Sequence, residues 1–183
     1  MIAGVLVLAA FTIFIIWRAH LLELTLQGES EQPQLVDKPA PNFSATTPDG
    51  RTVSLADFHG QKNIVVAFWA SWCGPCRLEM PDLARFYKRH HTDSSDFEVL
   101  AVSIDHEPKD AEEFAAGQKL RFPVLLDSNE RMADDYGVYS IPTMFVINKN
   151  GKITYGHSGY SDAMEYRLAS ELGLKEDAHG DTE

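Results

Sequence analysis

Apolar residues gather in three consecutive segments in the middle of the chain, and their spacing predicts a strand, a helix and a second strand. Residues 63–69 are continuously apolar after Asn63 and rich in β-branched and aromatic side chains, which is typical of a buried strand. Residues 77–91 instead place apolar side chains at intervals of three and four, which is typical of a helix. Residues 97–104 form a second, largely apolar run. Strand, helix and strand in this order predict a right-handed parallel βαβ unit.

The segments on either side of this unit complete a mixed α/β pattern. Pro48, Asp49 and Gly50 lie between two short segments and predict a β-hairpin, and Asn150-Gly151 between two apolar runs predicts another. The remaining expected elements, in chain order, are a helix over residues 108–118, a strand over 122–126, a short helix over 131–137, strands over 143–148 and 152–155, and a helix over 161–172.

The N-terminal segment is apolar over its first 17 residues, interrupted only by Gly4 and Thr12. This length lies at the short limit for a membrane-spanning helix and near that of a signal-peptide core. A cleavable signal would have basic residues before the apolar run and a small-x-small cleavage site after it, and neither feature is clear here. We therefore expect residues 1–26 to form an uncleaved membrane anchor helix, with a cleaved signal or a buried helix as the alternatives.

Polar and acidic segments border the rest of the chain. Residues 27–37 have the composition of a linker, residues 38–174 are long enough for one domain with its own core, and residues 175–183 resemble an acidic disordered tail. The formal net charge of −11 argues against nucleic acid as a partner, because phosphates need a basic surface. A solubilising surface accounts for the acidity.

The only two cysteines, Cys73 and Cys76, lie where the predicted strand over residues 63–69 gives way to the predicted helix. Side chains three apart on a helix are about 5–6 Å apart at Cβ, so the two thiols can form a disulfide. Cys73 is expected at the helix N-terminus, where unpaired N–H groups and the helix dipole favour a thiolate. Cys76, one turn further in, is expected to be more buried.

Two other uses of this cysteine pair compete with a redox role. A structural zinc site needs four ligands, and the sequence has neither a second C-x-x-C nor a histidine at ligand spacing from the pair. A purely structural disulfide is the other alternative, but so short a loop constrains the unfolded chain very little. C-x-x-C in a βαβ context favours a redox-active pair.

These residues, taken together, resemble a known family. The supporting motifs are Trp72-Cys73-Gly74-Pro75-Cys76 after an apolar strand, Pro81 in the following helix, Ile141-Pro142-Thr143 before a late strand, and the front-end segments 38–43, 49–50 and 54–58. Over residues 38–173 the chain is similar to the membrane-anchored TlpA/ResA/CcmG group of the redoxin (AhpC/TSA) superfamily. The resemblance implies a thioredoxin fold, an α/β fold whose central mixed sheet is flanked by helices, with an N-terminal β-hairpin extension and an inserted helix.

The resemblance also implies roles for individual residues. Cys73 matches the attacking thiol and Cys76 the resolving thiol, and Pro142 matches a cis-proline that faces the disulfide. A proline turn leaves the preceding backbone, here Ile141, free to pair with an extended substrate. The remaining residues of the motif, Trp72, Gly74 and Pro75, are expected to contact the substrate with Ile141 and Pro142. The alternative for Pro142 is an ordinary proline at the start of a strand.

One departure from cytosolic thioredoxins concerns the proton acceptor. Their buried aspartate is replaced here by Ala67, whereas ResA-like relatives have a glutamate three residues past the second cysteine, which is Glu79 in this chain. At i, i+3 from Cys76, Glu79 could accept the proton of that thiol as it attacks a mixed disulfide. The alternative is a solvated glutamate on the helix surface.

The expected activity is reduction of disulfides in partner proteins through the Cys73/Cys76 dithiol. The Gly74-Pro75 dipeptide lacks the histidine of oxidising relatives, which favours a reductant. No flavin, haem or nucleotide motif is present, so we expect no cofactor and a membrane dithiol protein as electron donor. The resemblance suggests apocytochrome c, in cytochrome c maturation, or copper-site assembly proteins as clients.

Alternatives to this activity are a thiol peroxidase and a copper-binding assembly factor. A peroxidase would have a T-x-x-C context, but Ala70, Ser71 and Trp72 precede Cys73, and a copper site would need a wider cysteine spacing. For localisation, Arg18 after the apolar run weakly favours a cytoplasmic domain on the positive-inside rule. The dithiol chemistry favours the opposite side, and we expect the domain in the periplasm or another extracytoplasmic space.

Overall fold

The computed structural model describes residues 14, 15, 17, 18, 33 and 35–174. The chain divides into two units, residues 1–31 and 32–183, and the folded elements below belong to the second. Most of the predicted anchor over 1–26, the first part of the linker over 27–37 and the tail over 175–183 lie outside the described residues. Among the described residues, no helix has both the length and the apolar character needed to cross a membrane.

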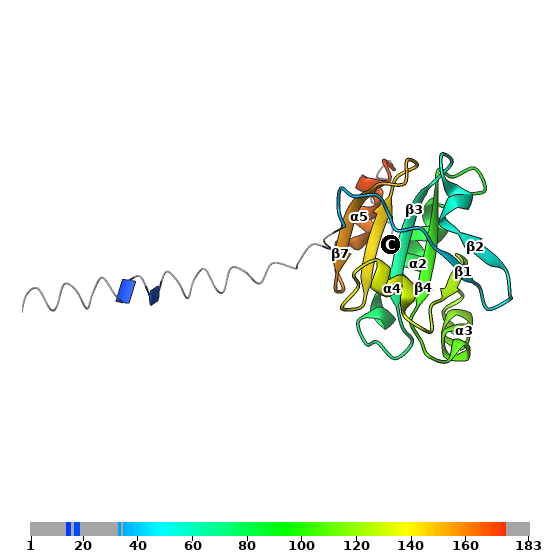
Figure 1. The fold of residues 1–183 in the computed structure, drawn as a ribbon, viewed down its shortest axis with the longest axis horizontal. Coiled ribbons are helices and arrows are strands. Elements are labelled where there is room, and N and C mark those ends of the chain that lie inside the picture. The colour runs from blue at the N-terminus through cyan, green and yellow to red at the C-terminus, as the bar shows by residue number, and fades with distance from the viewer. Residues whose placement is uncertain (1–13, 16, 19–32, 34, 175–183) are drawn as a thin grey trace, which may run out of the picture. The chain divides into compact units, whose positions relative to one another are not determined.

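A single mixed sheet of seven strands forms the centre of the domain (Figure 1), in the order β2-β1-β5-β4-β3-β6-β7. Its central strands β3 and β4 are parallel, and β6 runs antiparallel to β3. The strands are β1 (Ser44–Thr46), β2 (Thr52–Ser54), β3 (Asn63–Trp69), β4 (Phe97–Ser103), β5 (Val124–Leu126), β6 (Thr143–Ile147) and β7 (Ile153–Ser158).

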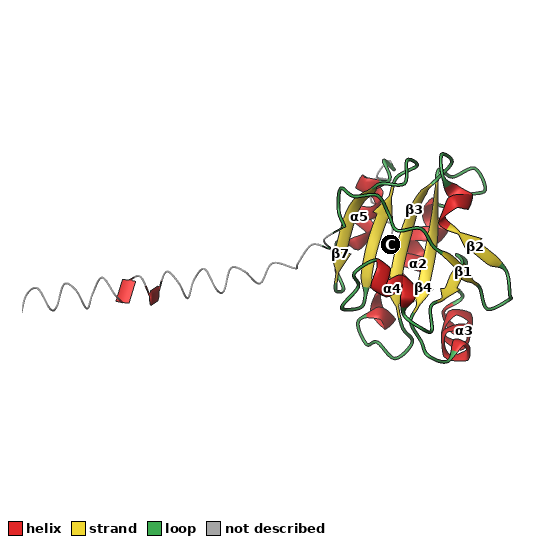
Figure 2. Cartoon of the chain, in the orientation of Figure 1, coloured by secondary structure: helices red, strands yellow, loops and turns green. Residues whose placement is uncertain are grey.

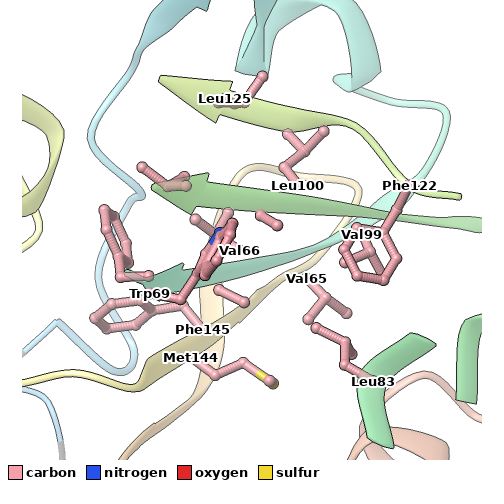
Figure 3. Packing of buried hydrophobic residues seen from close by; sticks show 14 of the residues in the cluster. Val65, Val66, Trp69, Leu83, Val99, Leu100, Phe122, Leu125, Met144 and Phe145 are labelled. Carbon is pink, nitrogen blue, oxygen red and sulfur yellow. The ribbon is translucent and has the colours of Figure 1, made fainter. Parts of the chain in front are cut away.

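Helices flank this sheet (Figure 2), and their apolar residues form the core with those of the strands. They are α2 (Cys76–His90), α3 (Pro108–Gln118), α4 (Arg131–Asp135) and α5 (Met164–Glu171), with a 3-10 turn, η1, at Leu55–Phe58. Because successive strand residues face opposite sides, β3 serves both layers. Val65 lies next to Leu83 of α2 (Figure 3), while Phe68 packs against Tyr136, which follows α4. Helices α2 and α5 contact each other.

The apolar pattern predicted most of these elements. The βαβ unit of β3, α2 and β4 is confirmed, as are the hairpins whose turns contain Gly50 (φ 82°) and Gly151 (φ 77°). The strand expected over residues 152–155 is longer, because β7 stays paired with β6 as far as Ser158. The last helix is correspondingly shorter than the range 161–172 and starts only at Met164.

The segment before β1 is also more ordered than a linker would be. Leu35 and Val36 pack against the core, and the Asp37 N–H donates to the carbonyl oxygen of Ile153 over 2.9 Å. Pro33 also packs closely against Gly156 of β7, where a Cβ would lie only 3.0 Å from the proline ring. The linker predicted over residues 27–37 thus includes residues 35–37 that belong to the fold, which its polar composition did not indicate.

Candidate active site

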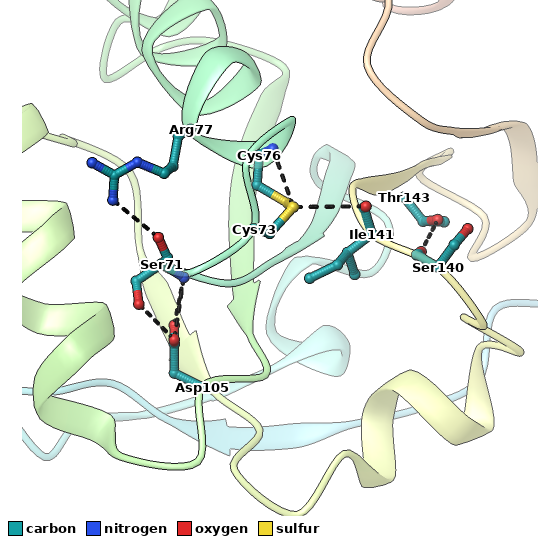
Figure 4. Close-up of a disulfide and its surroundings, with 8 residues drawn as sticks. All are labelled: Ser71, Cys73, Cys76, Arg77, Asp105, Ser140, Ile141 and Thr143. Atoms are coloured by element: carbon teal, nitrogen blue, oxygen red, sulfur yellow. Dashed lines mark hydrogen bonds between the residues drawn. A yellow bond between two sulfur atoms is a disulfide. The ribbon is translucent and has the colours of Figure 1, made fainter.

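The two cysteines form a disulfide at the start of α2, with their Cα atoms 5.2 Å apart (Figure 4). Cys73 precedes the helix and is 6% exposed, whereas Cys76 is its first residue and is fully buried. The Cys76 N–H points at the sulfur of Cys73 over 3.2 Å. In the reduced protein this N–H and the helix N-terminus favour a thiolate at Cys73. A partner can therefore reach only the Cys73 sulfur.

A buried carboxylate holds the loop that leads into the disulfide. Asp105 is 2% exposed and accepts hydrogen bonds from the Ser71 N–H (3.0 Å), the Ser71 hydroxyl (2.7 Å) and the Ser103 hydroxyl (2.7 Å). Ser71 follows β3 and Ser103 ends β4, so the carboxylate joins the ends of two parallel neighbours. Arg77 adds a second tie on the solvent side, because its guanidinium donates to the Ser71 carbonyl oxygen over 3.1 Å and lies over the Phe114 ring.

Replacing Asp105 with asparagine should lower the free energy of unfolding by about 3 kcal/mol, because an amide cannot accept all three hydrogen bonds in a buried place. Urea unfolding followed by fluorescence measures this value. Asp93→Asn, which changes an exposed carboxylate in the same way, is the control and should stay within about 0.5 kcal/mol of the parent protein. Equal stability of the two variants would contradict a structural role for Asp105.

A second loop faces the disulfide from the start of β6. The Ile141–Pro142 peptide bond is cis, as the resemblance implied. The Cys73 sulfur lies 3.7 Å from the Ile141 carbonyl oxygen. The loop is fixed on both sides, because the Thr143 hydroxyl donates to the Ser140 carbonyl and the Gly159 N–H donates to the Pro142 carbonyl, each over 2.7 Å. The Ile141 N–H itself makes no hydrogen bond to another described residue.

Exposed side chains lie on the two loops that meet at the disulfide. Trp72 is 65% exposed and Tyr139, two residues before Ile141, is 95% exposed. Gly74 and Pro75, between the two cysteines, are exposed as well. All five residues predicted to contact substrate thus lie on the two loops that meet at the disulfide, with Pro142 buried and Ile141 half-buried. Tyr139 was not predicted, because an exposed tyrosine in a loop has no distinguishing sequence pattern.

Glu79 is buried rather than solvated. It lies one turn after Cys76 on α2, is 2% exposed, and its Oε1 atom makes no hydrogen bond to another described residue. Burial, with a smaller contribution from the negative charge of Asp82, raises the pKa of Glu79 from 4.5 to about 8. Such a carboxyl can exchange a proton near neutral pH, as a general acid or base requires. The position of the missing thioredoxin aspartate, Ala67, is fully buried in β3.

Sequence reasoning missed Asp105 and Ser71. The available clue was topological, since an acidic residue two positions past the second strand of a βαβ unit lies at the same sheet edge as the residues that follow the first strand. The apolar pattern assigns the strands but not the partner of a single carboxylate, so this pairing became visible only in the structure.

This arrangement defines a thioredoxin-like thiol-disulfide oxidoreductase, because the less buried of its two cysteines, Cys73, is followed on the same helix by a resolving cysteine and a buried carboxyl group. Comparison with known proteins specifies the family. Residues 36–156 match the AhpC/TSA family. The chain belongs to this family and, within it, to the thioredoxin-like oxidoreductases of the ResA type.

Individual relatives agree with that assignment. Thiol-disulfide oxidoreductase ResA of Bacillus thuringiensis subsp. konkukian (strain 97-27) is 34% identical over 123 residues, which cover 67% of this chain and 69% of the relative. Sporulation thiol-disulfide oxidoreductase A of Bacillus subtilis (strain 168) is 37% identical over 128 residues, covering 69% and 74%. The crystal structure of StoA from Bacillus subtilis superimposes with a TM-score of 0.60 at 28% identity, covering 72% of this chain and 97% of StoA.

Proposed function

We propose that this oxidoreductase works as a reductant of disulfide bonds in extracytoplasmic client proteins, with apocytochrome c and copper-site assembly proteins as the client classes to test first. The observation that carries the proposal is the position of the Cys73 sulfur, 3.7 Å from the carbonyl oxygen of Ile141, a residue whose own N–H has no partner among the described residues. An extended client segment can pair with this backbone while its disulfide meets Cys73.

The proposed reaction proceeds through a mixed disulfide. The Cys73 thiolate attacks one sulfur of the client disulfide, the client S–S bond breaks, and the first client thiolate leaves. The Cys76 thiol then loses its proton to Glu79 and attacks the Cys73 sulfur, which releases the second client thiolate and forms the Cys73–Cys76 disulfide. The client disulfide is reduced by two electrons, which come from the Cys73/Cys76 dithiol as it is oxidised to a disulfide. A membrane dithiol protein must then reduce the disulfide again.

Client binding is proposed to combine main-chain pairing with aromatic contacts. Trp72 and Tyr139 present large exposed rings on the two loops at the disulfide. Aromatic rings of this kind bury much apolar area at low entropic cost, which suits binding to varied polypeptide segments. The backbone of Ile141 would give affinity without demanding a particular client sequence.

Trapping tests this function directly. Cys76→Ser should accumulate a covalent complex of chain and client, because serine cannot resolve the mixed disulfide. The complex should be visible on a non-reducing gel and disappear on reduction, and mass spectrometry of its partner identifies the client class. The double variant Cys73→Ser, Cys76→Ser is the control and should trap nothing. Trapping of no protein, together with rapid turnover of peroxide by the parent chain, would instead favour the peroxidase alternative.

The proposed location can be tested in cells. We propose that residues 1–26 hold the domain on the extracytoplasmic side of the membrane, supported by the apolar run at the N-terminus. Alkaline phosphatase fused after residue 183 should therefore be active, because it needs an oxidising compartment to fold. Deletion of residues 1–26 should abolish that activity. An inactive phosphatase together with an active cytoplasmic reporter at the same position would place the domain in the cytoplasm.

A further inference from the structure

A small cavity adjoins Glu79. Its volume of about 10 Å³ is enough for about one water molecule. It lies where α2, β6, β7 and α5 meet, and its lining residues are Glu79, Met144, Tyr155, His157, Met164 and Leu168. Three of these side chains are apolar, so the only polar side chains facing the cavity are Glu79, Tyr155 and His157. The two residues of β7 are therefore the side chains through which a proton could enter or leave Glu79 on this side of α2.

The geometry favours an exchange of protons across this space. Glu79 is 2% exposed and its Oε1 atom has no described hydrogen-bond partner, so a bridging water would satisfy a carboxyl oxygen that is otherwise costly to bury. His157 and Tyr155 are half-buried, and their rings lie nearly parallel with centroids 6.5 Å apart. Both therefore reach from the cavity toward solvent at the β7 edge of the sheet.

We propose that His157 is a proton-relay residue, which passes protons between solvent and Glu79 through one water molecule in this cavity. The inference rests on the proposed role of Glu79 as acceptor of the Cys76 proton. In the reducing turnover, the proton taken from Cys76 moves from the Glu79 carboxyl to the water, from the water to the neutral imidazole, and from the imidazole to solvent. No electron moves in these steps. Reduction of the Cys73–Cys76 disulfide uses the same path inward.

The surrounding charges suit His157 better than Tyr155 for this task. Burial and then the positive charge of Arg167 on α5 lower the pKa of His157, and they outweigh the opposite effect of the Gly159 backbone. The ring is therefore neutral at pH 7, and a neutral imidazole can accept a proton. Burial raises the pKa of Tyr155, and the negative charges of Glu171 and Glu79 act in the same direction, which outweighs the lowering effect of Arg167, so this phenol keeps its proton. A proton on His157 is held less tightly than on Glu79, so His157 passes it on to solvent.

The test measures proton-coupled exchange in both directions by stopped-flow fluorescence between pH 6 and 9. The probes are oxidised glutathione for the forward direction and dithiothreitol for reduction of the Cys73–Cys76 disulfide. His157→Gln keeps size and polarity but cannot relay protons in this range, and it should slow both directions by about threefold or more and change the pH profile. His59→Ala, at a histidine outside this cavity, is the control and should match the parent chain.

Two further measurements separate a relay from a packing role. Added imidazole should restore part of the rate in His157→Ala, and His157→Gln should cause no further slowing in a Glu79→Gln background, because the path is already cut. Parent-like rates in His157→Gln, or equal slowing in both backgrounds without imidazole rescue, would overturn the inference. The proposed reductant function can fail separately from the relay. If protein clients stay oxidised while His157→Gln still slows the dithiothreitol reaction, the reductant function is refuted and the relay is supported.

Discussion

Replacing Cys73 with serine will reduce disulfide exchange to the uncatalysed rate, the largest effect expected of any substitution in this protein. Of the two cysteine sulfurs, a partner can reach only that of Cys73, since Cys76 is fully buried. A serine hydroxyl is not ionised at neutral pH and cannot form a mixed disulfide. The rate is measured by reduction of insulin disulfides with dithiothreitol as electron source.

Cys76→Ser provides the matched comparison, because it should lose turnover but keep the first chemical step. Its Cys73 thiol should still react rapidly with iodoacetamide at neutral pH, and in the reduced parent chain Cys73 should be alkylated well before Cys76. Peptide mapping after a short labelling time measures this order. Preferential labelling of Cys76 would reverse the assignment of attacking and resolving thiols.

Replacing Glu79 with glutamine should slow disulfide exchange by about tenfold or more, because the amide keeps the size of the side chain but cannot accept a proton. In the parent chain the rate of the resolving step should rise with pH through about 8, as the carboxyl ionises. The variant should lack this rise and still form the Cys73–Cys76 disulfide. Glu112→Gln, at an exposed glutamate of α3, is the control.

Glu79→Gln should slow disulfide exchange but raise the free energy of unfolding at alkaline pH. The folded pKa of Glu79, about 8, lies above its ordinary value of 4.5, so folding favours the protonated form. The contribution of Glu79 to the free energy of unfolding of the parent chain should be greatest below pH 4.5. That contribution should fall as the pH rises from 4.5 to 8. At pH 9 the free energy of unfolding of Glu79→Gln should exceed that of the parent chain by about 2 kcal/mol or more, since each pKa unit corresponds to about 1.4 kcal/mol. Parent-like exchange and stability would leave Glu79 without a role in proton transfer.

The parts of this protein that sequence reasoning predicted best are those with local patterns. The apolar run of β3 has the bounds that its composition indicated, and the helical spacing after Cys76 identified α2. The C-x-x-C spacing placed both sulfurs at the start of that helix, because one helical turn brings residues three apart together. These features need no information from distant parts of the chain.

The parts that escaped prediction depend on residues far apart in sequence. The burial of Glu79 could not be derived from α2 alone, since Met164 and Leu168 of α5 and residues of β7 close its surroundings. The tie between Ser71 and Asp105 depends on the pairing of β3 with β4. Likewise, residues 35–37 are held against the domain by hydrogen bonding to β7, which a polar composition does not indicate.

The strand order has a consequence for engineering. The active site is built on three adjacent strands at the middle of the sheet. Ser71 follows β3, Asp105 follows β4, and the Ile141–Pro142 turn precedes β6. The β1–β2 hairpin lies at the far edge, beyond β5. Strands β5 and β4 thus lie between this hairpin and β3, the strand that leads to the disulfide. A tag or binding peptide inserted in the hairpin turn at Gly50 could direct the enzyme to chosen clients while leaving its chemistry unchanged.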